Sequence, residues 1–163
     1  MQEKKFSTKT KINLDEYIKF NRTIQRKINK TYLRLFISIA IILVAAVVCF
    51  LLDVKHIAIA FALAAVVLVI QIPIKMKKSE KEIYNSNKVI QDVESEISFY
   101  EDCFEQTNSL GTSKITYDKI YRILENDTNL YIMISKNQGY IIIKENCSVE
   151  LIDFIKNLTP NKK

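Results

Sequence analysis

Two long apolar blocks interrupt an otherwise polar chain. The first covers residues 35–52 and the second covers residues 57–74, and neither contains a charged residue. Each block is apolar on all sides rather than along one stripe. As a helix, each would be roughly 27 Å long, close to the thickness of about 30 Å of the hydrocarbon core of a bilayer. We therefore predict two transmembrane helices rather than the core helices of a soluble bundle.

The segment between the blocks, residues 53–56, has room only to turn the chain, which predicts an antiparallel hairpin with an outer turn. Lysine and arginine are concentrated on both sides of the hairpin, whereas the turn offers only Lys55. Because basic flanks favour the cytoplasmic side, we expect both termini in the cytoplasm. The basic residues expected to contact lipid headgroups electrostatically are Arg22, Arg26, Lys27, Lys30, Arg34, Lys75, Lys77 and Lys78.

The segment before the hairpin, residues 1–34, carries two further patterns. Apolar and polar residues alternate over residues 4–12, which predicts a half-buried strand. Asn13 followed by Glu16 resembles a capping box, so a basic amphipathic helix should begin near Leu14. Three placements remain open for this helix: on the membrane surface, continuous with the first span, or packed under the cytoplasmic domain.

The chain after the hairpin begins with a polar stretch, residues 75–92, which we predict as a helical linker ending at about Asp92. Residues 93–159 then form short runs rich in Ile, Tyr, Phe and Thr, separated by turn-like groups. This pattern predicts a sheet of about five antiparallel strands. A closing helix should start at the N-cap Ser148, present Val149, Leu151, Ile152, Ile155 and Leu158 on one face, and stop at Pro160.

This small α+β unit is short for independent stability. We therefore expect the N-terminal strand, residues 4–12, to join its sheet across the hairpin.

Composition and charge limit the classes of binding partner that the chain can be expected to have. Of the 163 residues, 48% are hydrophobic and only 2 are glycine, so the chain lacks the glycine-rich loops that cradle nucleotide phosphates. The net charge is +6, but residues 93–163 hold eight Lys/Arg against eleven Asp/Glu. The excess positive charge therefore flanks the spans, where it favours membrane lipids as partners and gives no reason to expect nucleic acid.

Candidate catalytic residues lack the groups that would activate them. His56 is the only histidine and lies in the outer turn, so a histidine-based zinc site or catalytic triad is incomplete. Cys103 and Cys147 have no histidine on their side of the membrane. Asp102, Glu105, Asp118, Glu125 and Asp127 are typical of a solvated acidic surface. We expect no enzymatic activity, no cofactor and no metal.

The order of these features resembles a known family. The residues that carry the likeness are Phe99-Tyr100-Glu101-Asp102, then Ser113-Lys114-Ile115-Thr116-Tyr117 with Ile120, and the apolar strand pair ending at Lys144. Together with the basic start and the hairpin, they resemble the YcxB-like family of small bacterial membrane proteins. The resemblance implies the bacterial cell membrane and a pleckstrin-homology-like sheet capped by a C-terminal helix. It implies no reaction.

These features favour a non-enzymatic membrane protein that displays a cytoplasmic interaction domain, as a scaffold or regulator. We expect a protein partner at an exposed sheet edge or at an acidic face formed by Asp118, Glu125 and Asp127. One alternative is a sensor of anionic lipid or membrane state. A second is an oligomeric small transporter or pore. Alanines 58, 60, 62, 64 and 65 give the second span a small-sided surface for packing on the first span or on another protomer.

Overall fold

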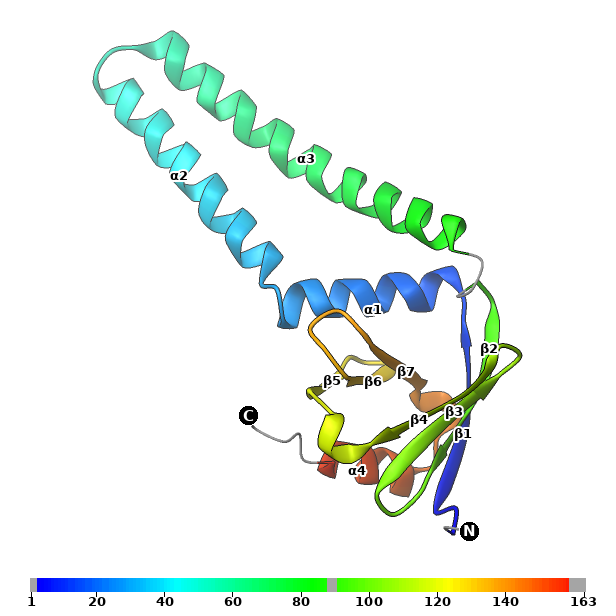
Figure 1. Ribbon diagram of the computed structural model, residues 1–163. Helices are drawn as coiled ribbons and strands as arrows, with labels where there is room; N and C mark the ends of the chain where they lie inside the picture. The colour runs from blue at the N-terminus through cyan, green and yellow to red at the C-terminus, as the bar shows by residue number, and fades with distance from the viewer. Residues whose placement is uncertain (1–2, 88–90, 159–163) are drawn as a thin grey trace.

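The computed structural model describes residues 3–87 and 91–158. A long helical hairpin projects from a small domain of strands and short helices, and a further helix lies between them (Figure 1). The element order is that of a chain that starts in the domain, leaves it for the hairpin and then returns.

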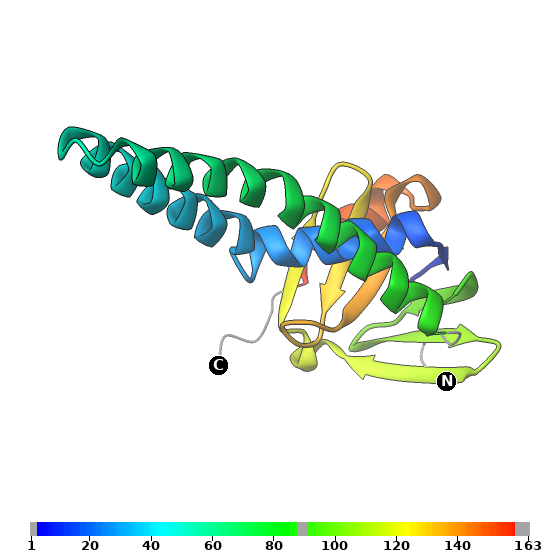
Figure 2. The same ribbon diagram turned by 90° about the horizontal axis from the view of Figure 1, so that it is seen from above.

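The hairpin consists of α2 (Thr31–Leu51) and α3 (Lys55–Ser86), which lie side by side in both views (Figures 1 and 2). Both helices are long and apolar enough to cross a membrane, and 0% and 11% of their most apolar eighteen-residue stretches are buried in the protein. A core helix of a soluble protein would instead be mostly buried. The structure thus supports a membrane protein with two spanning helices.

The second helix extends well beyond the apolar block. α3 passes through Pro73 without ending and continues to Ser86, so most of the predicted linker belongs to the same helix as the second span. The expected helix end near Asp92 is wrong, since Gln91 and Asp92 form a turn and Asp92 has a φ of 51°. Residues 88–90 lie outside the described residues.

The N-terminal strand joins the sheet across the hairpin, as predicted. β1 (Phe6–Ile12) pairs antiparallel with β2 (Val93–Phe99) over all seven residues, from Phe6 opposite Phe99 to Ile12 opposite Val93. The whole hairpin is therefore inserted into the connection between two neighbouring strands.

The end of α3 is attached to this strand pair. The buried Tyr84 hydroxyl donates a hydrogen bond to the Ile12 carbonyl at 3.1 Å and accepts one from the Asp92 amide at 3.1 Å. The Tyr84 ring also lies 5.6 Å from that of Tyr17. This contact fixes the point at which the chain re-enters the domain.

The domain has two antiparallel sheets instead of the predicted one. The first has the order β1-β2-β3-β4, with β3 (Cys103–Asn108) and β4 (Gly111–Thr116); the second has the order β5-β6-β7, formed by Arg122–Glu125, Asn129–Met133 and Gly139–Ile143. A 3-10 turn, Tyr117–Lys119, separates them, and the Tyr117 hydroxyl donates to the Tyr100 carbonyl at 2.8 Å. That anchored turn redirects the chain, so β5 starts a new sheet.

The closing helix α4 (Val149–Asn157) begins as predicted, with the Ser148 side chain accepting a hydrogen bond from the Leu151 amide. Leu151 and Ile155 are buried in a core formed with both sheets, which includes Phe99 and Ile132. The placement of Val149 on the apolar face is wrong, because this residue is 70% exposed in the first turn. The predicted stop at Pro160 lies outside the described residues. Two small sheets closed by a C-terminal helix are consistent with a pleckstrin-homology-like domain.

The first helix, α1 (Leu14–Lys27), packs against the second sheet. Phe20 and Ile24 are buried against Tyr131, Met133 and Ile141. The helix therefore takes one of the three predicted placements, packed on the domain. α1 does not run continuously into the first span, because the chain turns at Lys30, which has a left-handed φ of 51°.

Deleting residues 1–12 should expose the tail to protease while leaving membrane insertion intact. The deletion removes every β1 partner of β2 and opens the domain core at Phe99. Limited proteolysis of membrane fractions measures the first effect, and the amount of protein in the membrane fraction measures the second. Lys11→Ser, at an exposed position of β1, is the control; an equally resistant tail after deletion would contradict the structural role of β1.

Candidate functional site

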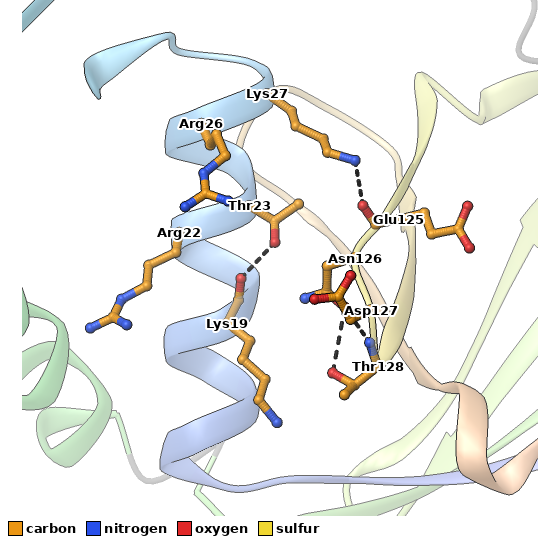
Figure 3. A pocket seen from close by; sticks show the side chains of 9 residues that line it. All are labelled: Lys19, Arg22, Thr23, Arg26, Lys27, Glu125, Asn126, Asp127 and Thr128. Atoms are coloured by element: carbon orange, nitrogen blue, oxygen red, sulfur yellow. Dashed lines mark hydrogen bonds between the residues drawn. The ribbon is translucent and has the colours of Figure 1, made fainter. Parts of the chain in front are cut away.

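The basic residues of α1 line two clefts, and Arg22 and Arg26 take part in both. Lys27 extends toward the loop between β5 and β6, whereas Arg22 extends away from that loop (Figure 3). α1 is held in place by its own N-cap, where the Asn13 side chain accepts a hydrogen bond from the Glu16 amide at 2.9 Å. Two clefts result, one on each side of the helix.

The first, which we call the loop cleft, has a volume of about 440 Å³. Lys27 donates a hydrogen bond to the Glu125 carbonyl across it. Asn126 orders the loop by accepting hydrogen bonds from the amides of Thr128 and Asn129. Its lining residues are Lys19, Arg22, Thr23, Arg26, Lys27, Glu125, Asn126, Asp127 and Thr128 (Figure 3).

The Glu125 carboxylate is already engaged within the domain. Lys144 lies 2.6 Å and Lys156 lies 2.8 Å from the same carboxylate oxygen. Hydrogen bonds from these two ammonium groups lower the pKa of Glu125. The charge of the Glu125 carboxylate is therefore largely balanced by these two lysines.

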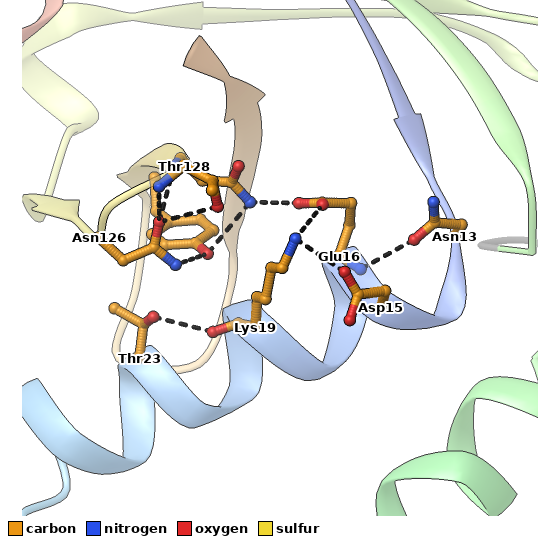
Figure 4. A network of polar contacts seen from close by, with 9 residues as sticks. Asn13, Asp15, Glu16, Lys19, Thr23, Asn126 and Thr128 are labelled. Carbon is orange, nitrogen blue, oxygen red and sulfur yellow. Dashed lines mark hydrogen bonds and ion pairs between the residues drawn. The ribbon is translucent and has the colours of Figure 1, made fainter. Parts of the chain in front are cut away.

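A buried polar network joins α1 to β6 (Figure 4). The fully buried Asn129 donates to the Glu16 carboxylate and to the Tyr131 hydroxyl, the latter at 3.3 Å. Asn126 donates to the same hydroxyl at 2.8 Å. Burial raises the pKa of Tyr131, so the hydroxyl stays protonated.

Lys19 completes this network from the surface side. Its ammonium lies 2.7 Å from Asp15 and 2.9 Å from Glu16, and these carboxylates raise the pKa of the lysine. Glu16 thus uses its side chain for Lys19 and Asn129, in place of the return bond to the N-cap that a capping box requires. The pattern of residues does not predict the Asn129 contact, because an asparagine in an apolar strand run has no periodic signature.

The second cleft lies between α1 and the end of the hairpin nearest the domain, and we call it the hairpin-base cleft. It has a volume of about 280 Å³. Its lining residues are Arg22, Arg26, Tyr32, Pro73, Met76, Lys77 and Glu80. Glu80 is 5% exposed, and neither of its carboxylate oxygens accepts a hydrogen bond from the part of the chain that the structure describes.

The structure brings together some of the eight basic residues predicted to meet lipid. Arg22, Arg26 and Lys77 line the hairpin-base cleft, while Lys27 faces the loop cleft. The other predicted residues lie exposed in the connection before α2, in its first turn, or on α3; these are Lys30, Arg34, Lys75 and Lys78. Lys78 faces Glu82 at 3.8 Å on its own helix.

The three carboxylates of the predicted acidic face do not share one surface element. Asp118 lies in the 3-10 turn before β5, whereas Asp127 lies in the loop after it. Glu125 is bound by its two lysines. A role for these residues in partner binding stays a prediction.

The candidate catalytic residues remain apart. His56 lies in the first turn of α3, at the hairpin tip. Burial raises the pKa of the Cys103 and Cys147 thiols, which disfavours the reactive thiolate. Over residues 3–87 and 91–158, no group of three His, Cys, Asp or Glu side chains is placed to hold a metal ion.

The fold and the clefts define a class: a two-helix membrane hairpin inserted between the first two strands of a small α+β domain. Within it, residues 99–159 match the family model described as YcxB-like protein. This segment is similar to the YcxB-like family, and the resemblance seen in the sequence is confirmed there. The match starts at the last residue of β2, so the hairpin and α1 lie outside it. Comparisons with curated proteins and with solved structures give no match.

Asn129→Ala should lower the free energy of unfolding by about 1–3 kcal/mol, because the buried Glu16 carboxylate loses a hydrogen-bond donor. Chemical denaturation of the detergent-solubilised full chain measures this. Asn137→Ala, at an exposed loop position, should change the value by less than about 0.5 kcal/mol. Equal effects of the two substitutions would contradict the proposed importance of the network.

The stability gained from Glu125 should depend on pH. In the folded protein the pKa of Glu125 lies below its ordinary value of 4.5. The ionised carboxylate therefore stabilises the fold at neutral pH, and this stabilisation is lost as the pH falls through the lowered pKa. The carboxylate is partly exposed, so the effect is small. The melting temperature of the wild type should therefore be higher than that of Glu125→Gln at pH 7, and the difference between the two should shrink below about pH 4. A constant difference over this range would rule out the ion pairs as its cause.

Proposed function

We propose that this chain is a non-enzymatic integral membrane protein of the bacterial cell membrane that displays an interaction domain at the cytoplasmic face. The basic residues on both flanks of the hairpin support an orientation with both termini in the cytoplasm. The domain then acts by its position, as a scaffold or regulator that captures a protein partner beside the membrane.

The pairing of β1 with β2 is the observation that carries this proposal. These strands enclose the hairpin, so the domain is attached to the membrane at two points of its own sheet. Tyr84 fixes the return of α3, and Phe20 and Ile24 fix α1 on the other sheet. A domain held in this way presents one chosen side to the cytoplasm, whereas a single flexible tether would not.

The open edge of the first sheet is the best candidate surface for the partner. β4 pairs only with β3 among the described strands, and its first four residues are exposed. A two-residue loop joins the strands at Asn108 and Gly111. Along such an antiparallel pair, residues that hydrogen-bond to the partner strand alternate with residues that do not. At the other end of the pair, the amide of Tyr117 donates to the Asp102 carbonyl, which fixes the order of this alternation.

This alternation sets which backbone groups point outward. Residues 112, 114 and 116 direct their amides and carbonyls away from β3 and toward the open edge. Such a row accepts an extended segment of a partner protein by strand addition. The edge suits this role better than the acidic residues, because Glu125 already has its lysine partners.

The two cysteines of the domain, the strongest candidates for a catalytic nucleophile, do not support an enzymatic activity. The Cys103 side chain is buried, Cys147 is partly buried, and burial raises the pKa of both thiols. The absence of enzymatic activity is part of this proposal.

A sensor of anionic lipid or membrane state is the second candidate. One observation favours it: Arg22, Arg26 and Lys77 come from two helices to a single cleft beside the spans. Anionic headgroups attract such residues by on the order of 1 kcal/mol for each Lys or Arg near the surface.

Lys114→Pro should reduce partner capture by the full-length protein about tenfold or more, because proline removes an outward amide and obstructs the edge. Crosslinking in membranes followed by affinity capture identifies the partner and measures the loss. Lys114→Ala is the matched control: it removes the ammonium, and the contact with Glu105 at 3.8 Å, but keeps the amide. Its capture should stay close to wild type. Equal loss with both variants would assign capture to the lysine charge, and no loss with either would dismiss the edge.

A further inference from the structure

Four ionisable side chains from two helices meet at the hairpin-base cleft. Arg22 and Arg26 lie one turn apart on α1, and Lys77 and Glu80 lie about one turn apart on α3. They contribute three positive charges and one negative charge. The cleft therefore favours an anion.

Glu80 is the second feature that points to a ligand. Its side chain is 7% exposed, and the closest cation is the Arg22 Nε, 3.9 Å from one carboxylate oxygen. That separation is too long for a hydrogen bond. A buried carboxylate without donors is costly, so a group that donates hydrogen bonds to Glu80 would recover free energy on binding.

The three cations are also available for a ligand. Arg26 and Lys77 make no hydrogen bond or ion pair with residues of the described ranges, and Arg22 faces Glu80 alone. A guanidinium group offers paired N–H donors in the geometry that phosphate oxygens accept. Phosphate is therefore the anion that the two arginines fit best.

The position of the cleft identifies the source of this phosphate as a lipid. Pro73 lies at the end of the second apolar block, and Tyr32 lies in the first turn of α2, just before the first block. Headgroups lie at this level, where the apolar stretches end. Beside Tyr32, Leu33 is 53% exposed and Phe36 is 71% exposed, so α2 continues as an apolar surface for acyl chains.

We propose that the hairpin-base cleft binds the headgroup of an anionic phospholipid that carries hydroxyl groups, of the phosphatidylglycerol kind. Arg22, Arg26 and Lys77 hold the phosphate, and a headgroup hydroxyl donates a hydrogen bond to the Glu80 carboxylate. This site deepens the second candidate function, lipid sensing, and rests on it; it does not involve β4, so a variant of either surface can fail alone.

The test is native mass spectrometry of the full-length protein in neutral detergent with added lipids of identical acyl chains. Phosphatidylglycerol should bind more tightly than phosphatidylethanol, a phosphodiester of the same single charge without headgroup hydroxyls, and more tightly than phosphatidylethanolamine. Lys77→Gln should weaken binding of phosphatidylglycerol about fivefold. Its neighbour Lys78 supplies the matched control: this residue is outside the cleft, and Lys78→Gln should change binding by no more than about twofold.

Glu80→Met separates hydroxyl recognition from a structural role. It should reduce the affinity for phosphatidylglycerol to that for phosphatidylethanol. The melting temperature should not fall, because the substitution removes a buried carboxylate that accepts no hydrogen bond from the described residues. Three results would overturn the proposal. These are equal losses with Lys77→Gln and Lys78→Gln, tighter binding of phosphatidylethanolamine, and binding of soluble glycerol phosphate as tight as that of the lipid.

Discussion

The antiparallel pairing of β1 with β2 is the interaction on which the rest of the structure depends. It joins residues separated by the entire hairpin, so the first sheet is complete only when the chain has left the domain and returned. The loop-closure cost of this pairing is lowered because α2 and α3 already lie antiparallel and return the chain close to its starting point. The return of the chain from the hairpin and the completion of the first sheet are thereby linked through one strand pair.

Two further contacts convert this pairing into a fixed orientation. Before the hairpin, α1 buries Phe20 and Ile24 on the second sheet. The hydrogen bond from Asn129 to Glu16 also restricts the orientation of α1, which apolar packing alone would not do. On the other side, Tyr84 hydrogen-bonds both the last residue of β1 and the turn before β2. These contacts attach the domain to the helix that precedes the hairpin and to the end of α3.

Charge is distributed in a way that gives each side of α1 a different role. On the side of the β5–β6 loop, Lys27 and the two lysines around Glu125 satisfy acceptors of the domain. On the side of the hairpin, Arg22, Arg26 and Lys77 line a cleft with the buried Glu80, the one carboxylate among its described lining residues, which accepts no hydrogen bond from any described residue. The same helix thus ties the sheets together and offers cations at the level of the membrane surface.

The amino-acid sequence by itself determined the local elements of this protein. The uncharged blocks define the spans, alternation defines β1, and Asn13 and Ser148 start α1 and α4, because capping and periodicity depend only on neighbouring residues. The tertiary structure alone decided the division into two sheets, the packing of α1 on the second sheet, and the placement of Arg22, Lys77 and Glu80 in one cleft. These features arise from contacts between residues far apart in the chain, and a basic residue that lines a cleft looks in sequence like the exposed one next to it.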